Sequence, residues 1–278
     1  MKQKISRAIF GVAIAATGVA AQAADWSDIS MGYRYGETYR EPYNPEKISK
    51  NILHFTYVSG SQAGSDFLNV DLLMSDTKDS PDKQGHAREV YAVYRHTFDL
   101  AHLTGISFQS GPLRGVGLTA GLDLNSKSGD SYQSKKRMLV AGPTLQLDVP
   151  GFLNISLLAL RESNAPAAHR ERYTYKTHPM LNLNWGIPLG TLPLSFEGYA
   201  NFIDAKGKDE FGAETRPETN IDAQVMWDAG SAMGMRKNSF RLGVQYQYWK
   251  NKFGNDSSKD TSGGSTARTP MIRAEYHF

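Results

Sequence analysis

The last ten residues of the chain, 269–278, read Thr-Pro-Met-Ile-Arg-Ala-Glu-Tyr-His-Phe. Successive residues of a β-strand point to opposite faces, so this stretch sorts into an apolar face and a mainly polar one. The first face carries Ile272, Ala274, Tyr276 and Phe278, and the second carries Met271, Arg273, Glu275 and His277. A closing strand with one oily face and a final aromatic residue is typical of an outer-membrane barrel, whose aromatic girdles lie at the membrane interface.

The first 23 residues have the organisation of a signal peptide. Three basic residues precede an apolar run at 8–21, and a small-x-small site, Ala-Gln-Ala, follows at 21–23. The run is short of the roughly 20 residues that a membrane-spanning helix needs, and polar residues follow it. We therefore expect a signal peptide at 1–23 that is cleaved after Ala23, export, and a mature outer-membrane β-barrel at 24–278.

Composition limits the partners. Removal of the predicted signal peptide takes three of the 31 basic residues, which leaves 28 basic residues against 28 acidic ones. A neutral chain argues against nucleic acid as a partner. The absence of cysteine excludes thiol catalysis and cysteine metal sites, and the seven histidines have no metal-binding spacing. We expect neither a metal nor a cofactor.

Alternation continues along the mature chain and predicts an all-β fold: a twelve-stranded antiparallel transmembrane barrel. The mean hydropathy of such a barrel stays low because every second residue of each strand faces a water-filled lumen. One strand, at 152–162, begins polar on its inner face but turns apolar at Leu158 and Leu160. The expected strands are 29–36, 51–59, 66–75, 88–99, 118–124, 139–147, 152–162, 173–187, 194–202, 221–227, 240–249 and 269–278.

The connections alternate between short and long, as expected for periplasmic turns and extracellular loops. Short ones are expected at 60–65, 149–151, 188–192 and 229–238, and long polar ones at 36–50, 75–87, 125–135, 162–172, 204–219 and 251–268. The segment 99–114 falls on the short side but is long, so we expect it to have local structure of its own. A soluble β-sandwich would also alternate. The signal peptide, the uneven connections and the terminal Phe278 together favour the membrane barrel.

The inner faces of the strands mix charges, amides and aromatic rings. Such groups are first of all a solvated wall whose charges pair between strands. Rings such as Tyr91, Tyr199 and Trp249 can also stack on a planar solute, while the polar groups supply donors and acceptors. The expected lumenal set is Arg34, His54, Asn69, Asp71, Glu89, Tyr91, Arg95, Lys176, His178, Asn182, Asn184, Glu197, Tyr199, Asn201, Asp222, Gln224, Arg241, Gln245, Gln247, Trp249, Arg273 and Glu275. This chemistry alone indicates a small polar solute.

The order of short motifs along the chain resembles the Tsx-type nucleoside-specific channels of the Gram-negative outer membrane. The motifs are Asp25-Trp26-Ser27, Tyr33-Arg34-Tyr35-Gly36, Arg40-Glu41-Pro42, Glu89-Val90-Tyr91, Tyr94-Arg95, Gly142-Pro143-Thr144, the segments 150–154, 195–202 and 248–254, and the ending Glu275-Tyr276-His277-Phe278. The ending also resembles the signal that the barrel-assembly machinery reads during biogenesis.

The resemblance implies a monomeric barrel in the outer-membrane lipid, with a narrow lumen through which nucleosides diffuse between weak sites. The candidate solute-binding residues are Glu89, Tyr91, Arg95, Glu197, Tyr199, Asn201, Gln245 and Trp249.

Three other functions fit a barrel. A general porin for sugar-type solutes would use the same rings and amides. A barrel hydrolase is less favoured, because no histidine has a serine two residues further along one strand face, and we expect no enzyme activity. An adhesin would act through its long loops, which carry no cluster of aromatic residues.

Overall fold

The computed structural model describes residues 24–80, 86–129, 132–169 and 171–278. The predicted signal peptide lies outside them. The strands are β1 (Trp26–Tyr39), β2 (Ile48–Ser61), β3 (Gly64–Ser75), β4 (Arg88–Asp99), β5 (Leu113–Ser128), β6 (Arg137–Leu147), β7 (Phe152–Asn164), β8 (Tyr173–Thr174), β9 (His178–Pro188), β10 (Leu194–Ile203), β11 (Glu218–Asp228), β12 (Phe240–Lys250) and β13 (Thr266–His277). The helical elements are η1 (Thr77–Asp79), α1 (Leu100–Thr104), α2 (Ala229–Ala232) and η2 (Lys252–Gly254).

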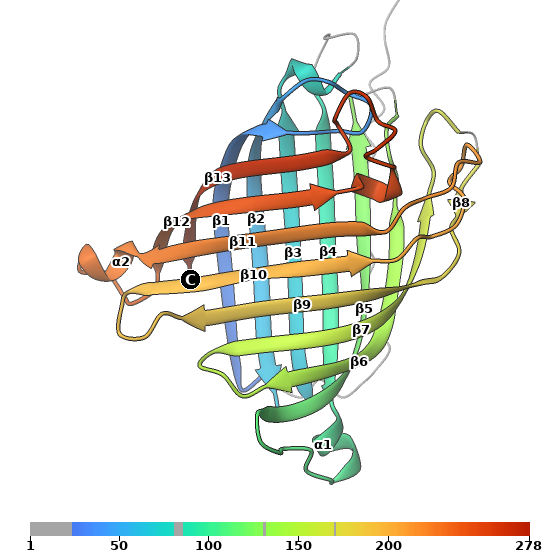
Figure 1. Ribbon diagram of the computed structural model, residues 1–278. Coiled ribbons are helices and arrows are strands. Elements are labelled where there is room, and N and C mark those ends of the chain that lie inside the picture. Colours follow the sequence, from blue (N-terminus) through green and yellow to red (C-terminus); the bar gives the residue numbers. More distant parts are fainter. Residues whose placement is uncertain (1–23, 81–85, 130–131, 170) are drawn as a thin grey trace, which may run out of the picture.

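The strands form a closed antiparallel barrel (Figure 1). Each long strand pairs with its neighbours in the chain, β7 pairs with β9, and β13 returns to pair with β1. Twelve strands make the wall, since the two-residue β8 only extends the pairing at the end of β7. The predicted twelve-stranded barrel is confirmed, and so is its closure by the last strand against Met31 to Tyr35.

Most observed strands are longer than the predicted ones, because pairing continues into segments whose polarity suggested loops, while β4 has the predicted bounds. β5, for example, begins at Leu113 and ends at Ser128. One predicted strand, 173–187, is divided into β8 and β9. The N–H of Lys176 bonds to the carbonyl of Lys206 in the β10–β11 connection, so the ladder along β7 is interrupted there. Lys176 lies between the two strands, and its side chain is exposed.

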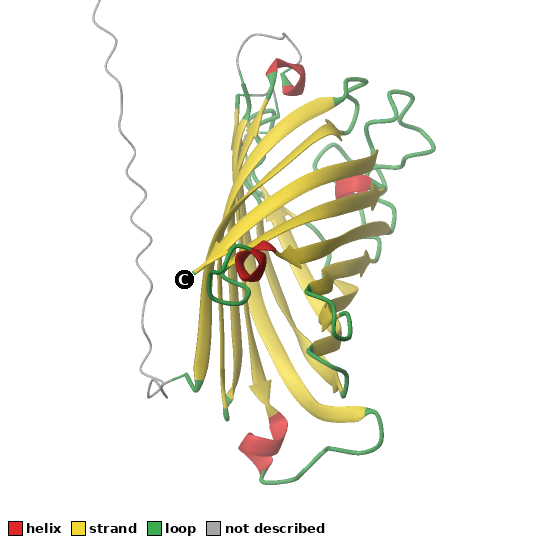
Figure 2. Ribbon diagram, turned by 90° about the vertical axis from the view of Figure 1, so that its left-hand side faces the viewer, coloured by secondary structure: helices red, strands yellow, loops and turns green. Residues whose placement is uncertain are grey.

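The connections lie at the two ends of the barrel, with α1 and α2 at the end opposite β8 and η1 (Figures 1 and 2). Helix α1 gives the segment after β4 the local structure that was expected for it. At its start the side chain of Asp99 accepts a hydrogen bond from the N–H of His102, a typical N-cap. No helix within the described residues is long and apolar enough to cross a membrane.

The two faces of the wall differ as the alternation predicts. On β13, Ile272 and Tyr276 are 61% and 41% exposed, whereas Met271 and Glu275 are 5% and 4% exposed. The same alternation holds on β7, where Leu157 is exposed and Leu158 is buried. Aliphatic and aromatic side chains therefore cover the outside of the barrel, as a surface in contact with lipid requires.

The ladder between β6 and β7 is interrupted at Gly142 and Pro143, although pairs continue on both sides. Proline has no N–H to donate, so it cannot complete a pair with β7. The backbones approach closely at this point: a Cβ atom on Gly142 would lie 2.0 Å from the carbonyl oxygen of Leu157.

We predict that Gly142→Ala destabilises the barrel by about 1–3 kcal/mol, because the backbone of β7 has to move away. Gly115→Ala is the matched control. Its Cβ would meet only the flexible end of the Gln146 side chain, at 3.0 Å. The urea midpoint of barrels folded into lipid vesicles measures the effect, and equal midpoints for the two variants would contradict the prediction.

Candidate functional site

The lumen is lined by the polar residues that the alternation assigned to it. All eight candidate solute-binding residues lie on inward positions of their strands, spread over β4, β10 and β12. They do not form one cluster. Each belongs to a network of hydrogen bonds and ion pairs with neighbouring strands, and these networks divide the lumen into distinct regions.

Glu197 belongs to an ion-pair network on β10, β12 and β13. The guanidinium of Arg241 contacts the Glu197 carboxylate, lies 3.1 Å from Glu275, and donates to the hydroxyl of Ser195 at 2.6 Å. Arg273 adds a further contact to Glu275 at 2.9 Å. The side chains of Arg241 and Glu275 are 12% and 3% exposed, so the network is largely removed from solvent. Its charges tie three strands together.

Gln245 belongs to the central part of the lumen. Its amide donates to Asp222 on β11 at 2.5 Å. Arg34 on β1 forms an ion pair of 2.5 Å with Asp71 on β3. Charges on the inner wall therefore also compensate one another between strands that are not adjacent.

Tyr91 and Tyr199 bring aromatic rings to the inner face of the wall. They lie on β4 and β10, which are not adjacent. The hydroxyl of Tyr91 donates to Asp123 at 2.8 Å, and Arg95 contacts the same carboxylate. Asp123 thus orients two of the candidate residues.

Asn201 ends a ladder of four amides on β7, β9 and β10. Asn182 donates to Asn201 at 2.7 Å, Asn184 donates to Asn182 at 3.0 Å, and Asn154 donates to Asn184 at 3.1 Å. Amides carry both donors and acceptors, so a ladder of this kind can exchange internal bonds for bonds to a solute. The signal in the sequence is the spacing of Asn182 and Asn184, two residues apart on one face.

Glu89 and Trp249 lie at the end of the lumen that carries the long connections. The indole N–H of Trp249 donates to Glu218 at 2.6 Å. The centroids of the Trp249 and Phe253 rings lie 4.9 Å apart. Glu89 accepts from Asn125 at 2.5 Å and lies 3.9 Å from the ammonium group of Lys50. These residues share the predicted face but belong to a different region from Tyr199.

Five buried lysines, none of them in the predicted lumenal set, surround this end of the lumen. Their side chains, on strands and connections, pair with carboxylates that lie largely outside the predicted set. The lysines are Lys50, Lys127, Lys136, Lys206 and Lys252, and their acidic partners are Glu41, Asp79, Glu89 and Glu162. Lys50 lies four residues before His54, which was predicted to face the lumen. Residues an even number of positions apart on a strand share a face, so this spacing could have placed Lys50 on the inner face.

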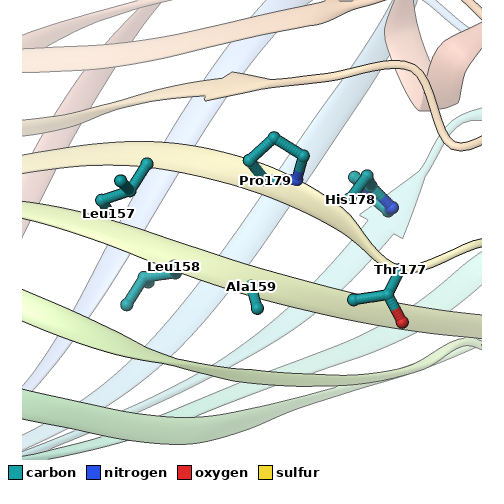
Figure 3. A pocket seen from close by; sticks show the side chains of 6 residues that line it. All are labelled: Leu157, Leu158, Ala159, Thr177, His178 and Pro179. Carbon is teal, nitrogen blue, oxygen red and sulfur yellow. The ribbon is translucent and has the colours of Figure 1, made fainter.

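The lumen also contains an apolar cluster, at the part of β7 where the sequence turns apolar on the inner face. Leu158 and Leu160 pack with Val140 and Met180, all 2–4% exposed. Beside it, a hollow of about 370 Å³ is lined by residues 157–159 of β7 and by residues 177–179 at the start of β9 (Figure 3). Leu157 and Pro179 line the hollow and belong to the outward set, so this hollow is not a lumenal site. No cluster of three or more metal-ligating side chains occurs in the described parts of the chain.

Comparisons with known proteins found distant likenesses among solved structures only. No family model matches the chain, and no curated protein matches it. The KdgM porin is 11% identical with a TM-score of 0.45, covering 90% of this chain and 99% of that one. The translocator domain of the autotransporter NalP from Neisseria meningitidis is 11% identical with a TM-score of 0.42, covering 91% and 88%. Pseudomonas aeruginosa OccK11 is 10% identical with a TM-score of 0.39, covering 91% and 96%.

Likeness at this level does not identify a solute. The barrel fold follows from the strand pairing itself.

We predict that Arg241→Met lowers the free energy of unfolding by about 3 kcal/mol, because it leaves the Glu197 carboxylate without its cation and leaves Glu275 with the Arg273 guanidinium but not that of Arg241. Adding Glu197→Gln should restore part of the loss, since the two residues are coupled. Arg216→Met is the control: its pair with Asp256 is solvent-exposed, and its loss should cost under about 1 kcal/mol. Urea unfolding in lipid vesicles measures all three, and an Arg241→Met value no larger than the control would refute the prediction.

Proposed function

We propose that this chain is an outer-membrane channel for passive diffusion of small polar solutes, and that nucleosides are its preferred solutes. The apolar outer face supports a place in lipid, and the polar lumen supports passage of water-soluble molecules. The chain acts as a monomer in this proposal, since one barrel encloses the whole lumen. Passage needs no energy source.

The observation that carries the proposal is the combination of an aromatic ring and amides on one strand face. Tyr199 is two residues from Asn201, the end of the amide ladder, and Tyr91 adds a second ring to the inner wall. A nucleoside has a planar base that stacks on an aromatic ring and polar edges that bond to amides. It carries no net charge, so it does not have to break the compensated ion pairs around it.

Sugar-type solutes remain the second candidate. Their hydroxyl groups would bond to the same asparagines, and their faces would also pack on tyrosine rings. A sugar lacks the planar base, so the two classes differ in how much they depend on the rings. Glu89, Arg95, Glu197, Gln245 and Trp249 complete the proposed lumenal path on either side of this region.

Liposome swelling tests the solute class. We expect vesicles that contain the folded chain to swell faster in adenosine or thymidine than in a neutral sugar of similar mass, because weak binding in the lumen raises the flux of the preferred solute. Equal swelling rates for all solutes would contradict nucleoside preference and indicate a general porin. Swelling no faster than in protein-free vesicles would exclude a channel.

Replacement of Tyr199 by Ala tests the site. Loss of one stacking ring is worth about 1–3 kcal/mol, so nucleosides should block the ion current through a single barrel about 5- to 150-fold more weakly. Tyr246→Ala removes a tyrosine from the outward face, where the side chain is 46% exposed, and should leave the block unchanged. Unaltered block in Tyr199→Ala would remove this ring from the solute path.

A further inference from the structure

Three buried lysines at the loop end of the lumen converge on one oxygen atom. The ammonium groups of Lys50, Lys252 and Lys127 lie 2.8, 3.2 and 3.7 Å from Oε1 of Glu41. Lys50 lies on β2, Lys127 on β5 and Lys252 in η2, so distant parts of the chain build the arrangement. The three lysine side chains are 2–7% exposed. We call these three lysines the lysine trio.

Glu41, like Lys252, lies in a connection and not on a strand. It belongs to the segment 40–47 between β1 and β2, whereas Lys50 and Lys127 are fixed on strands of the wall. The lysines also have contacts of their own. Lys127 lies 2.8 Å from Asp79, and Lys252 donates to the carbonyl of Arg40 at 2.7 Å. Movement of the Glu41 side chain would therefore leave at least two of the lysines held by other partners.

Lys252 depends most on Glu41, because among the described residues Glu41 is the one carboxylate that pairs with its ammonium group. Lys50 and Lys127 also lie near other carboxylates: Asp79 is 3.6 Å from Lys50 and 2.8 Å from Lys127, and Glu89 is 3.9 Å from Lys50. Loss of the Glu41 charge would leave the buried Lys252 cation without a carboxylate partner in the described part of the chain. A buried charge without a partner is strongly unfavourable, so the position of the Glu41 carboxylate has to be filled by an anion.

Electrostatics at Glu41 agree with this picture. Burial raises the pKa of its carboxyl, but the three lysines outweigh burial and hold the pKa well below its usual value. Glu41 is thus an anion at neutral pH, held by the trio in the way that a bound carboxylate would be.

We propose that the lysine trio is an anion-binding site, that Glu41 fills it as a tethered internal anion, and that the carboxylate or phosphate group of a solute replaces Glu41. Aromatic rings border the site, since the Lys252 ammonium lies 4.7 Å from the Trp249 ring and 5.0 Å from the Phe253 ring. Anions that also carry a planar ring fit best. The site adds charged solutes to the neutral ones that the channel proposal assigns to the middle of the lumen, and it does not depend on that proposal.

Calorimetric titration of the folded full chain in detergent with inorganic phosphate tests the site without any measurement of transport. Glu41→Gln removes the internal anion, so phosphate should bind at least tenfold more tightly than to the unaltered protein. Glu41→Gln combined with Lys252→Met should lose that gain. Glu46→Gln, the same change elsewhere in the 40–47 connection, should behave like the unaltered protein.

Phosphate binding by Glu41→Gln that is no tighter than binding by Glu46→Gln would overturn the proposal, and so would a gain that survives Lys252→Met. Should Glu41→Gln fail to fold, the unaltered protein provides the answer through amide hydrogen exchange. The N–H of Asn44 bonds to the carbonyl of Glu41 in the closed connection. Phosphate should speed its exchange relative to chloride at equal ionic strength, and equal rates would refute displacement of Glu41.

Discussion

Closure of the sheet is the constraint on which the rest of this structure depends. In hydrocarbon there is no water to pair with the free N–H and C=O groups of an edge strand, so a sheet that spans a membrane has to meet itself. Here β13 pairs with β1 from Ile272 to His277, and the N–H of Phe278 bonds to the carbonyl of Ile29 at 3.0 Å. The His277 ring adds a contact of 2.7 Å to Asp28. The two ends of the chain thus form the seam of the barrel.

Closure gives every strand one face toward lipid and one toward the lumen. The inner face then holds charges at close quarters, and each charge needs a partner. The chain meets this need region by region: Arg241 with Glu197 and Glu275, Arg34 with Asp71, and the lysine trio with Glu41. Paired charges and amides can exchange one hydrogen-bond partner for another. A polar wall of this kind can therefore support the barrel and also bind a solute weakly.

The alternation of side chains along a strand explains which residues of the candidate site could be predicted. Tyr199 and Asn201 share a face because they are two residues apart, and the alternation alone placed both in the lumen. The same rule placed Glu89 and Trp249 there, but it could not place them at the loop end with Asn125 and Glu218. Position along the barrel depends on strand tilt and register, which a single strand does not encode.

By itself the sequence determined the all-β class, the twelve strands, the facing of most side chains and the closing role of Phe278, because these follow from a two-residue period and local polarity. Only the tertiary structure decided which charges meet. Glu41 reads in sequence as a solvated loop residue, yet it lies against Lys50, Lys127 and Lys252. Those contacts span up to 211 positions of the chain, and no local pattern records them, since they exist only once the barrel has closed.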